Sequence, residues 1–287
     1  MMTPASARRP TKAERTAAAR ERERLAREEQ QRRARRNGLL AKWGVVLAVL
    51  VIVAVIAVVV VNTVRGRVPD AGPAPRGGND QGGITLVSPT ELRSTRTEDV
   101  DLAVLPDEPA APGTVPDGVG ASGDGPLQVV AYMDVNCVFC ADFETRHAER
   151  IQGWLDAGDI TLEYRTVAYL DRNSSTDFSS RGANAAACVA DAAPEAYLEF
   201  TRRVYGHYAE GELDDDGLLG LAEDAGAGDV RPCVEDGTFR PWVKYTTEAA
   251  KASGIGGTPT VYVDGENVEN AVSDFEQVVQ DRLDARG

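Results

Sequence analysis

An uninterrupted apolar run, residues 43–61, constrains this chain more than any other feature of its sequence. Its 19 residues, at about 1.5 Å of helix rise each, are long enough to span a hydrocarbon core of about 30 Å. A core helix of a soluble protein would keep a polar face, and a cleaved signal peptide would have an apolar region of only about 7–15 residues. The run is instead followed by Asn62 to Arg67, with no small-residue cleavage site. We therefore predict an uncleaved signal anchor, with one transmembrane helix at 43–64.

The charge distribution predicts the orientation of that helix. Residues 1–42 contain 13 Lys and Arg against 5 Glu, whereas the rest of the chain contains 18 against 40 Asp and Glu. Because Lys and Arg are retained on the cytoplasmic side, we expect residues 1–42 to form a basic cytoplasmic segment and the acidic body to be extracytoplasmic. The predicted location is the cell membrane. The negative body argues against nucleic acid as a partner.

A change in composition follows the apolar run. Residues 65–126 contain 20 Gly and Pro in 62 positions, which is typical of a segment that does not bury a core. We predict a flexible, disordered Gly/Pro-rich linker there, with residues 84–87 as its single strand candidate. The 161 residues that follow, 127–287, suffice for one well-buried domain.

The pattern of this body predicts an α/β fold. The order is strand, helix, strand, helical insertion, strand and helix, which places helices against a sheet. Apolar stretches predict the strands, and a 3.6-residue periodicity predicts the helices. The strands are expected over 127–133, 160–167 and 260–263, and the helices over 140–155, 176–191, 194–207, 216–225, 238–253 and 275–283.

A Cys-Val-Phe-Cys motif, Cys137 to Cys140, lies between the first strand of the body and the next helix. At a helix N-terminus, unpaired N–H groups and the helix dipole favour the thiolate of the first cysteine, and hence thiol–disulfide exchange. A structural disulfide is the alternative. Zinc would need a second ligand pair at a suitable spacing, which neither the other cysteines nor His147 and His207 supply, so we expect no metal and no cofactor. Asp134 is either a solvated strand-end residue or a charge that acts on the thiols.

Two segments resemble the DsbA family of thiol-disulfide oxidoreductases, which have a thioredoxin fold. Residues 125–144, with the strand, Asp134 and both cysteines of the motif, are similar to the active-site strand and helix of that family. Residues 254–265, which contain Gly-Thr-Pro-Thr, are similar to a second family segment. The resemblance covers residues 125–287 and implies a DsbA-like thioredoxin fold with a helical insertion over 127–287.

The resemblance also implies roles for individual residues. Cys137 would be the nucleophile that forms a mixed disulfide, and Cys140 would resolve it. Pro259 would be a cis-proline beside the site, and Thr258 would offer its backbone to an extended substrate. The motif departs from the family pattern at Val138-Phe139, where many members have proline or histidine. Neither residue offers a charge or a donor to the thiolate, so we expect an oxidant of intermediate strength, more oxidising than thioredoxin.

The remaining cysteines are Cys188 and Cys233. An even number of cysteines in an exported domain suggests pairing, and we predict a structural disulfide between these two. Two buried free thiols or a second redox pair are the alternatives. The acidic stretch Glu212 to Asp216 lacks the spaced oxygens and the glycine of a calcium loop, so we interpret it as a solvated turn.

Together these features predict a membrane-anchored, extracytoplasmic enzyme that introduces disulfides into exported proteins by oxidising their thiols. The alternatives are a reductase for exported disulfides and a tethered binding or chaperone module with a structural cysteine pair. The excess of Arg over Lys, 27 to 4, is typical of a GC-rich genome such as that of an actinobacterium. For such a protein the resemblance implies reoxidation by a quinone-coupled membrane partner similar to vitamin K epoxide reductase.

Overall fold

The computed structural model describes residues 67–95, 97–111 and 113–286, together with positions 21, 24, 27, 28, 49–53 and 55. Most of the predicted basic segment, 1–42, and most of the predicted transmembrane segment, 43–64, lie outside the described residues. Among the residues that are described, no helix combines the length and the hydropathy that a membrane crossing requires. The chain divides into two units, residues 1–67 and 68–287, and the second contains all four cysteines.

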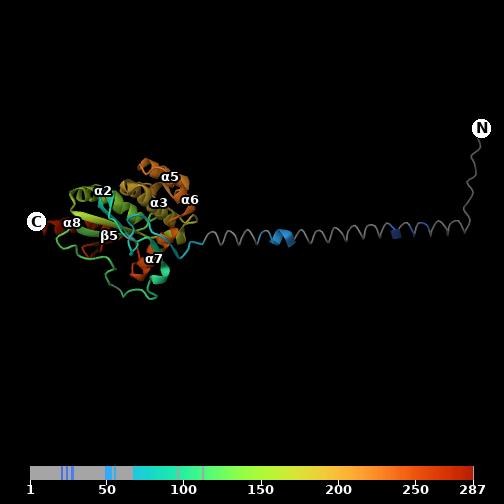
Figure 1. Cartoon of the computed structure of the whole chain (residues 1–287), viewed down its shortest axis with the longest axis horizontal. Coiled ribbons are helices and arrows are strands. Elements are labelled where there is room, and N and C mark those ends of the chain that lie inside the picture. The colour runs from blue at the N-terminus through green and yellow to red at the C-terminus, as the bar shows by residue number, and fades with distance from the viewer. Residues whose placement is uncertain are drawn as a thin grey trace, which may run out of the picture. The chain divides into compact units, whose positions relative to one another are not determined.

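A six-stranded mixed sheet forms the centre of the second unit (Figure 1). Its central strands β5 and β6 are parallel, and β7 pairs antiparallel with β5 on the other side. In spatial order the strands are β3 (Glu91–Leu92), β2 (Ile84–Ser88), β6 (Ile160–Thr166), β5 (Leu127–Met133), β7 (Thr260–Val263) and β8 (Glu266–Val268). The predicted strands are therefore confirmed. β3 and β8 were not predicted, because two or three residues carry no usable alternation.

Helices cover both faces of this sheet. One helix follows β5, five lie between β6 and β7 in the described part of the chain, and one follows β8. They are α2 (Val138–Ala157), α3 (Phe178–Ala192), α4 (Tyr197–Gly206), α5 (Asp215–Asp224), α6 (Arg231–Asp236), α7 (Arg240–Ala252) and α8 (Ala271–Asp284). The predicted helical insertion is confirmed. The short helix α6 escaped prediction because six residues do not establish a helical period.

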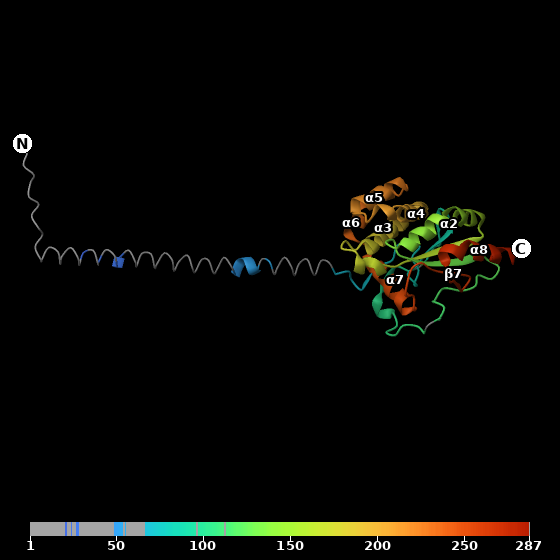
Figure 2. The same ribbon diagram turned by 180° about the vertical axis from the view of Figure 1, so that it is seen from behind.

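The two faces of β5 bury different clusters. Alternate residues of a strand point to opposite faces, and Figures 1 and 2 place α2 and α7 on opposite sides of the sheet. On the first face Val129, Ala131 and Met133 join the main core with α2 and α8. On the second face Val130 and Tyr132 pack with apolar residues of α7 and of the segment that follows it. Burial on both faces explains why β5 is an almost unbroken apolar segment.

The expectation of a flexible linker is wrong for the parts of this segment that form strands. β1 (Ala71–Pro73) pairs with β4 (Asp99–Asp101), and β2 adds to the free edge of β6 with Leu86 opposite Leu162. Leu86 has no exposed surface. The composition misled the prediction because some of the glycines serve close packing rather than flexibility. A Cβ at Gly83 would lie 2.2 Å from Glu163 Oε1, so no other residue fits there.

The predicted disulfide between Cys188 and Cys233 is present and joins α3 to α6 across a Cα–Cα distance of 5.8 Å. Cys188 is 1% exposed, in a helix that is buried over most of its length. The bridge therefore fixes the short helix α6 to the most buried helix of the insertion.

Candidate active site

The Cys-Val-Phe-Cys motif lies where β5 ends and α2 begins. Cys137 is the N-cap residue of α2 in an extended conformation, and the helix starts at Val138, two residues earlier than predicted. The Cys137 carbonyl accepts from the N–H groups of Cys140 (3.1 Å) and Ala141 (3.0 Å). Both thiols are free in this structure. The first thiol is thus held at the positive end of a long helix, as the motif predicted.

The two sequence segments that carry the family resemblance meet at this point. Cys137 Sγ lies 3.3 Å from the carbonyl oxygen of Thr258, and the Thr258–Pro259 peptide bond is cis. They meet because β7, which begins directly after Pro259, pairs with β5 so that Thr260 lies opposite Tyr132. The sheet therefore brings the predicted substrate-binding residues beside the predicted nucleophile.

The two thiols differ in their acidity. The pKa of Cys137 is lowered to about 6, chiefly because the Cys140 thiol donates a hydrogen bond to the thiolate. Burial opposes this shift, while Thr258 and the N–H groups of Cys140 and Phe139 favour it. Burial raises the pKa of Cys140 well above its ordinary value. The pair therefore consists of one thiolate and one protonated thiol near neutral pH. Thiol–disulfide exchange proceeds through the thiolate, so this arrangement suits that reaction.

The alkylation of the reduced protein should reveal this asymmetry. With a pKa of about 6, Cys137 is about 90% thiolate at pH 7, so we expect its rate of reaction with iodoacetamide to be half-maximal near pH 6. Cys140→Ala removes the main hydrogen-bond donor to the thiolate and should move this midpoint upward. A midpoint above pH 8 in the unaltered protein would contradict the assignment.

Asp134 holds the loop that precedes the motif. It has no exposed surface, so the solvated alternative is wrong. Its carboxylate accepts from the Ser179 hydroxyl (2.6 Å) and from the N–H groups of Asn136 (2.9 Å) and Leu170 (3.0 Å). Burial raises its pKa. The Asp134 N–H also lies 3.5 Å from Cys140 Sγ, so this residue ties β5, the motif and α3 together.

Glu212 makes a second connection to the motif, and it was interpreted as part of a solvated turn. Its carboxylate is exposed but accepts from Asn136 Nδ2 (2.9 Å), Ser174 Oγ (2.9 Å) and Thr176 Oγ1 (2.6 Å). The hydrogen bond from Thr176 is the largest cause of its lowered pKa. Asn136 directly precedes Cys137, so the helical insertion supports the loop from outside. Among the described residues, no group of His, Cys, Asp and Glu is arranged to hold a metal ion.

Glu144 is a buried carboxyl group that was not among the residues predicted for the site. Burial raises its pKa to about 7, and its Oε1 accepts from the Tyr164 hydroxyl at 2.5 Å. The sequence did carry a signal for it, because Cys140, Glu144, His147 and Ile151 are spaced as the residues of one helix face are. The structure buries all four.

Two apolar side chains remain exposed beside the thiols. Val138 is 42% exposed and Phe139 is 59% exposed. Thr258 and Pro259 are half-buried on the facing loop. The site thus presents an apolar surface next to a low-pKa thiol and the half-buried Thr258–Pro259 segment.

A dithiol between the central strand and its helix, facing a cis-proline loop from the neighbouring strand, defines a thioredoxin-fold protein. The chain belongs to the thioredoxin family, since residues 119–281 match the family model described as Thioredoxin. This match confirms the thioredoxin fold that the resemblance to the DsbA family implied. No curated protein matches the chain in sequence.

Solved structures share this fold. The chain is similar to MdbA, a thiol-disulfide oxidoreductase from Actinomyces oris, with a TM-score of 0.54 and 22% identity over 73% of this chain and 92% of that chain. MdbA from Corynebacterium matruchotii gives a TM-score of 0.51 and 17% identity over 75% of this chain and 94% of that chain. Reduced DsbA from Mycobacterium tuberculosis gives a TM-score of 0.48 and 26% identity over 64% of this chain and 95% of that chain.

Proposed function

We propose that this protein is a thiol-disulfide oxidoreductase that acts as a dithiol oxidase on exported proteins. The observation that carries the proposal is the pairing of a thiolate at Cys137, with a pKa of about 6, with a protonated and buried Cys140. The fold shared with two MdbA proteins, whose names describe thiol-disulfide oxidoreductases, supports it.

The chemistry follows from this asymmetry. In the oxidised protein a substrate thiolate attacks Cys137 Sγ, the bond to Cys140 breaks, and Cys140 leaves and takes up a proton. A second substrate thiolate then attacks the substrate sulfur of the mixed disulfide and displaces Cys137 as a thiolate. The substrate dithiol has become a disulfide. Its two electrons now reside on the Cys137/Cys140 pair, one of its protons is on Cys140 and the other is in solvent. A leaving thiol of low pKa leaves faster, which favours release of the product.

The direction of transfer is set by the relative stability of the two redox forms. Thiolate stabilisation favours the reduced form and makes the disulfide a stronger oxidant. A pKa of about 6 lies between values of about 7 for thioredoxin and about 3.5 for DsbA, which supports an oxidant of intermediate strength. We therefore infer a reduction potential between about −270 and −120 mV, the values of those two proteins.

Denaturant unfolding tests this direction. The reduced protein should unfold at higher denaturant than the form with Cys137–Cys140 oxidised, with Cys188–Cys233 closed in both. The Cys137 pKa is lower in the folded protein than in the unfolded chain, so the extra stability is present above pH 9 and is lost as the pH falls through 6. The oxidised form lacks this titration and serves as the control. A clearly more stable oxidised form would favour the reductase alternative.

We also propose that the chain is anchored in the cell membrane by residues 43–64, with a cytoplasmic N-terminus and an extracytoplasmic catalytic unit. The apolar run and the basic residues before it support this topology. The thiols of exported proteins would then be the substrates. A quinone-coupled membrane protein similar to vitamin K epoxide reductase would restore the disulfide.

A reporter fusion tests the topology. Alkaline phosphatase fused after residue 287 should be active, because that enzyme needs export to form its own disulfides. The same fusion to a chain that lacks residues 43–64 should be inactive. An inactive fusion of the full chain, with a cytoplasmic reporter active in its place, would reverse the orientation.

A further inference from the structure

The loop that carries Thr258 into the dithiol site is anchored at few points. It begins after α7, where the N–H of Ile255 donates to the Ala250 carbonyl oxygen (2.9 Å), and it ends at β7. Between these anchors Gly256 and Gly257 are exposed, and a Cβ at either would meet nothing within 4 Å. Neither glycine has a positive φ. The two glycines therefore give this stretch more backbone freedom than its packing requires.

Tyr169 holds this loop by its side chain. Its hydroxyl donates to the carbonyl oxygen of Ile255 at 2.7 Å. Among the described residues, only one other side chain from outside residues 254–260 makes a hydrogen bond to them, and it is the Cys137 thiol on Thr258. The half-buried Tyr169 ring packs against the cluster on the second face of β5, which also buries the Ile255 side chain. One tyrosine thus ties the loop down three residues before Thr258.

The same segment also holds the loop that precedes the motif. Tyr169 begins the 3₁₀ turn η2 (Tyr169–Asn173), which follows β6. The N–H of the next residue, Leu170, donates to the Asp134 carboxylate (3.0 Å). On the other side the N–H of Ala168 donates to Thr247 of α7 (3.0 Å). Three consecutive residues therefore link α7, the loop before the motif and the loop that faces it, and they fix these parts relative to one another.

The position of Thr258 matters for the reactive thiol. Its carbonyl oxygen lies 3.3 Å from Cys137 Sγ. The Cys140 thiol is the main cause of the lowered Cys137 pKa, and the Thr258 side chain adds to it. Hydrogen bonds weaken steeply with distance and misalignment, so a displacement of Thr258 changes the acidity of the thiol. Thr258 is also the residue expected to offer its backbone to a substrate.

We propose that Tyr169 is a positioning residue of the dithiol site, which holds the Thr258–Pro259 segment against Cys137 by fixing Ile255. Its hydroxyl bonds to the loop and not to a sulfur atom, so it takes no part in the exchange itself. Burial raises the pKa of Tyr169, and the hydroxyl therefore stays protonated and able to donate near neutral pH. The inference deepens the proposed function and rests on it only where a substrate is used.

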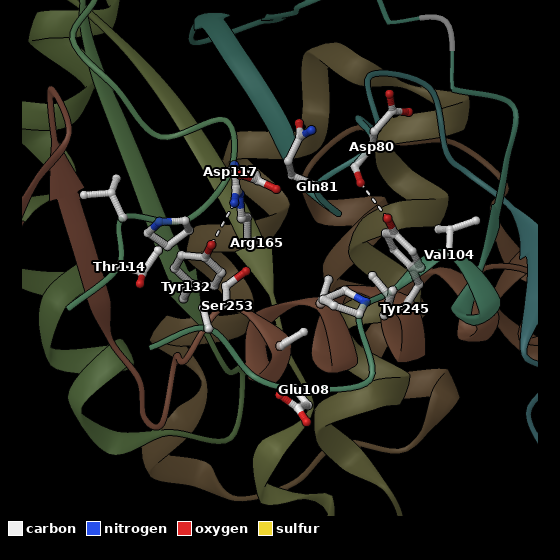
Figure 3. Close-up of a pocket in the computed structure, with 17 residues that line it drawn as sticks. Asp80, Gln81, Val104, Glu108, Thr114, Asp117, Tyr132, Arg165, Tyr245 and Ser253 are labelled. Carbon is white, nitrogen blue, oxygen red and sulfur yellow. Dashed lines mark hydrogen bonds between the residues drawn. The ribbon is translucent and has the colours of Figure 1, made fainter. Parts of the chain in front are cut away.

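Tyr169→Phe is the test, and Tyr245→Phe is its matched control. Figure 3 shows the Tyr245 hydroxyl bonded to the carbonyl oxygen of Asp80, at 2.6 Å. Both tyrosines thus donate to the backbone of a loop, and burial raises the pKa of both. Tyr245 lines a cavity that neither cysteine of the motif nor Thr258 lines. Each variant removes one hydroxyl group and keeps the ring, so both should fold, and only Tyr169→Phe should alter the dithiol site.

The first measurement is the pH dependence of Cys137 alkylation in the reduced full chain, in detergent micelles. Tyr169→Phe should raise the midpoint from near pH 6 by about half a pH unit, a roughly threefold smaller acid dissociation constant, because Thr258 is no longer held beside the thiolate. Tyr245→Phe should leave the midpoint unchanged. Amide hydrogen exchange at residues 256–258, measured by mass spectrometry, should become faster in Tyr169→Phe alone.

A double-variant cycle tests whether the effect passes through Thr258. Thr258→Val removes the side-chain hydroxyl group and should itself raise the alkylation midpoint. Tyr169→Phe should then add little in the Thr258→Val background, since both changes act on one contact. Full additivity of the two shifts would contradict this route.

Oxidation of a synthetic dithiol peptide by the pre-oxidised full chain separates binding from chemistry. Tyr169→Phe should raise the half-saturating peptide concentration about fivefold, because a loop that is only partly in its binding conformation lowers the apparent affinity by that fraction. The limiting rate should change by less than about twofold. The proposal is overturned if Tyr169→Phe leaves the alkylation midpoint unchanged, or if Tyr245→Phe moves it as far. If the unaltered chain oxidises no peptide while the midpoint still shifts, the oxidase function fails and the role of Tyr169 stands.

Discussion

Replacing Cys137 with serine should abolish disulfide transfer to a reduced dithiol peptide, with the rate falling by about a thousandfold or more. The serine hydroxyl is not ionised near neutral pH and cannot form the mixed disulfide through which exchange proceeds. The measurement is the rate at which the pre-oxidised full chain oxidises the peptide, monitored by mass spectrometry. The fold should survive, because Cys137 is the N-cap residue of α2 and serine is among the residues preferred there.

Cys140→Ser is the matched control. It keeps the Cys137 thiol but removes the resolving thiol, so it should accumulate a stable mixed disulfide with a disulfide-containing peptide. Cys137→Ser should form no such species. If the folded Cys137→Ser protein kept the activity of the unaltered chain, the binding or chaperone alternative would replace the enzyme.

Removal of the second cysteine pair should cost stability rather than activity. The disulfide between Cys188 and Cys233 closes a loop of sequence separation 45. For a loop of this length the chain-entropy model gives about 4 kcal/mol of stabilisation. The double variant Cys188→Ala/Cys233→Ala should therefore unfold at much lower denaturant, with its active-site thiols still reactive. Cys188 is also buried, so alanine leaves a small void that adds to the loss.

The matched control for this second prediction is Cys137→Ala/Cys140→Ala, which removes the other pair. A disulfide between Cys137 and Cys140 closes no long loop, so its removal should change the free energy of unfolding much less. Mild reductant gives an independent measurement. It should open Cys137–Cys140 first and leave two cysteines protected from alkylation. Equal labelling of four thiols in the folded protein, or a loss below about 1 kcal/mol in the double variant, would contradict a structural role.

The sequence was informative wherever the signal is local. An apolar strand, a helix N-terminus and two cysteines three residues apart form one continuous segment, so the motif and its place in the fold could be predicted at Cys137 and Cys140. The pairing of Cys188 with Cys233 was predicted from the even count of cysteines in a domain expected to be exported, once Cys137 and Cys140 were assigned to the motif. Helices of ten or more residues were found from their periodicity, whereas α6 and β8 were too short to carry one.

The tertiary structure decided what depends on contacts between distant segments. Residues 65–126 were predicted to be a flexible linker, yet β2 completes the sheet because β6 offers an unpaired edge, which no local composition reveals. The burial of Asp134 and the contacts of Glu212 with Asn136 likewise arise from segments that meet only in the folded chain. The same is true of the low pKa of Cys137, whose main cause is the position of the Cys140 thiol. Sequence determined which groups could react, while packing determined their protonation and their neighbours, because desolvation and hydrogen bonding act through space and not along the chain.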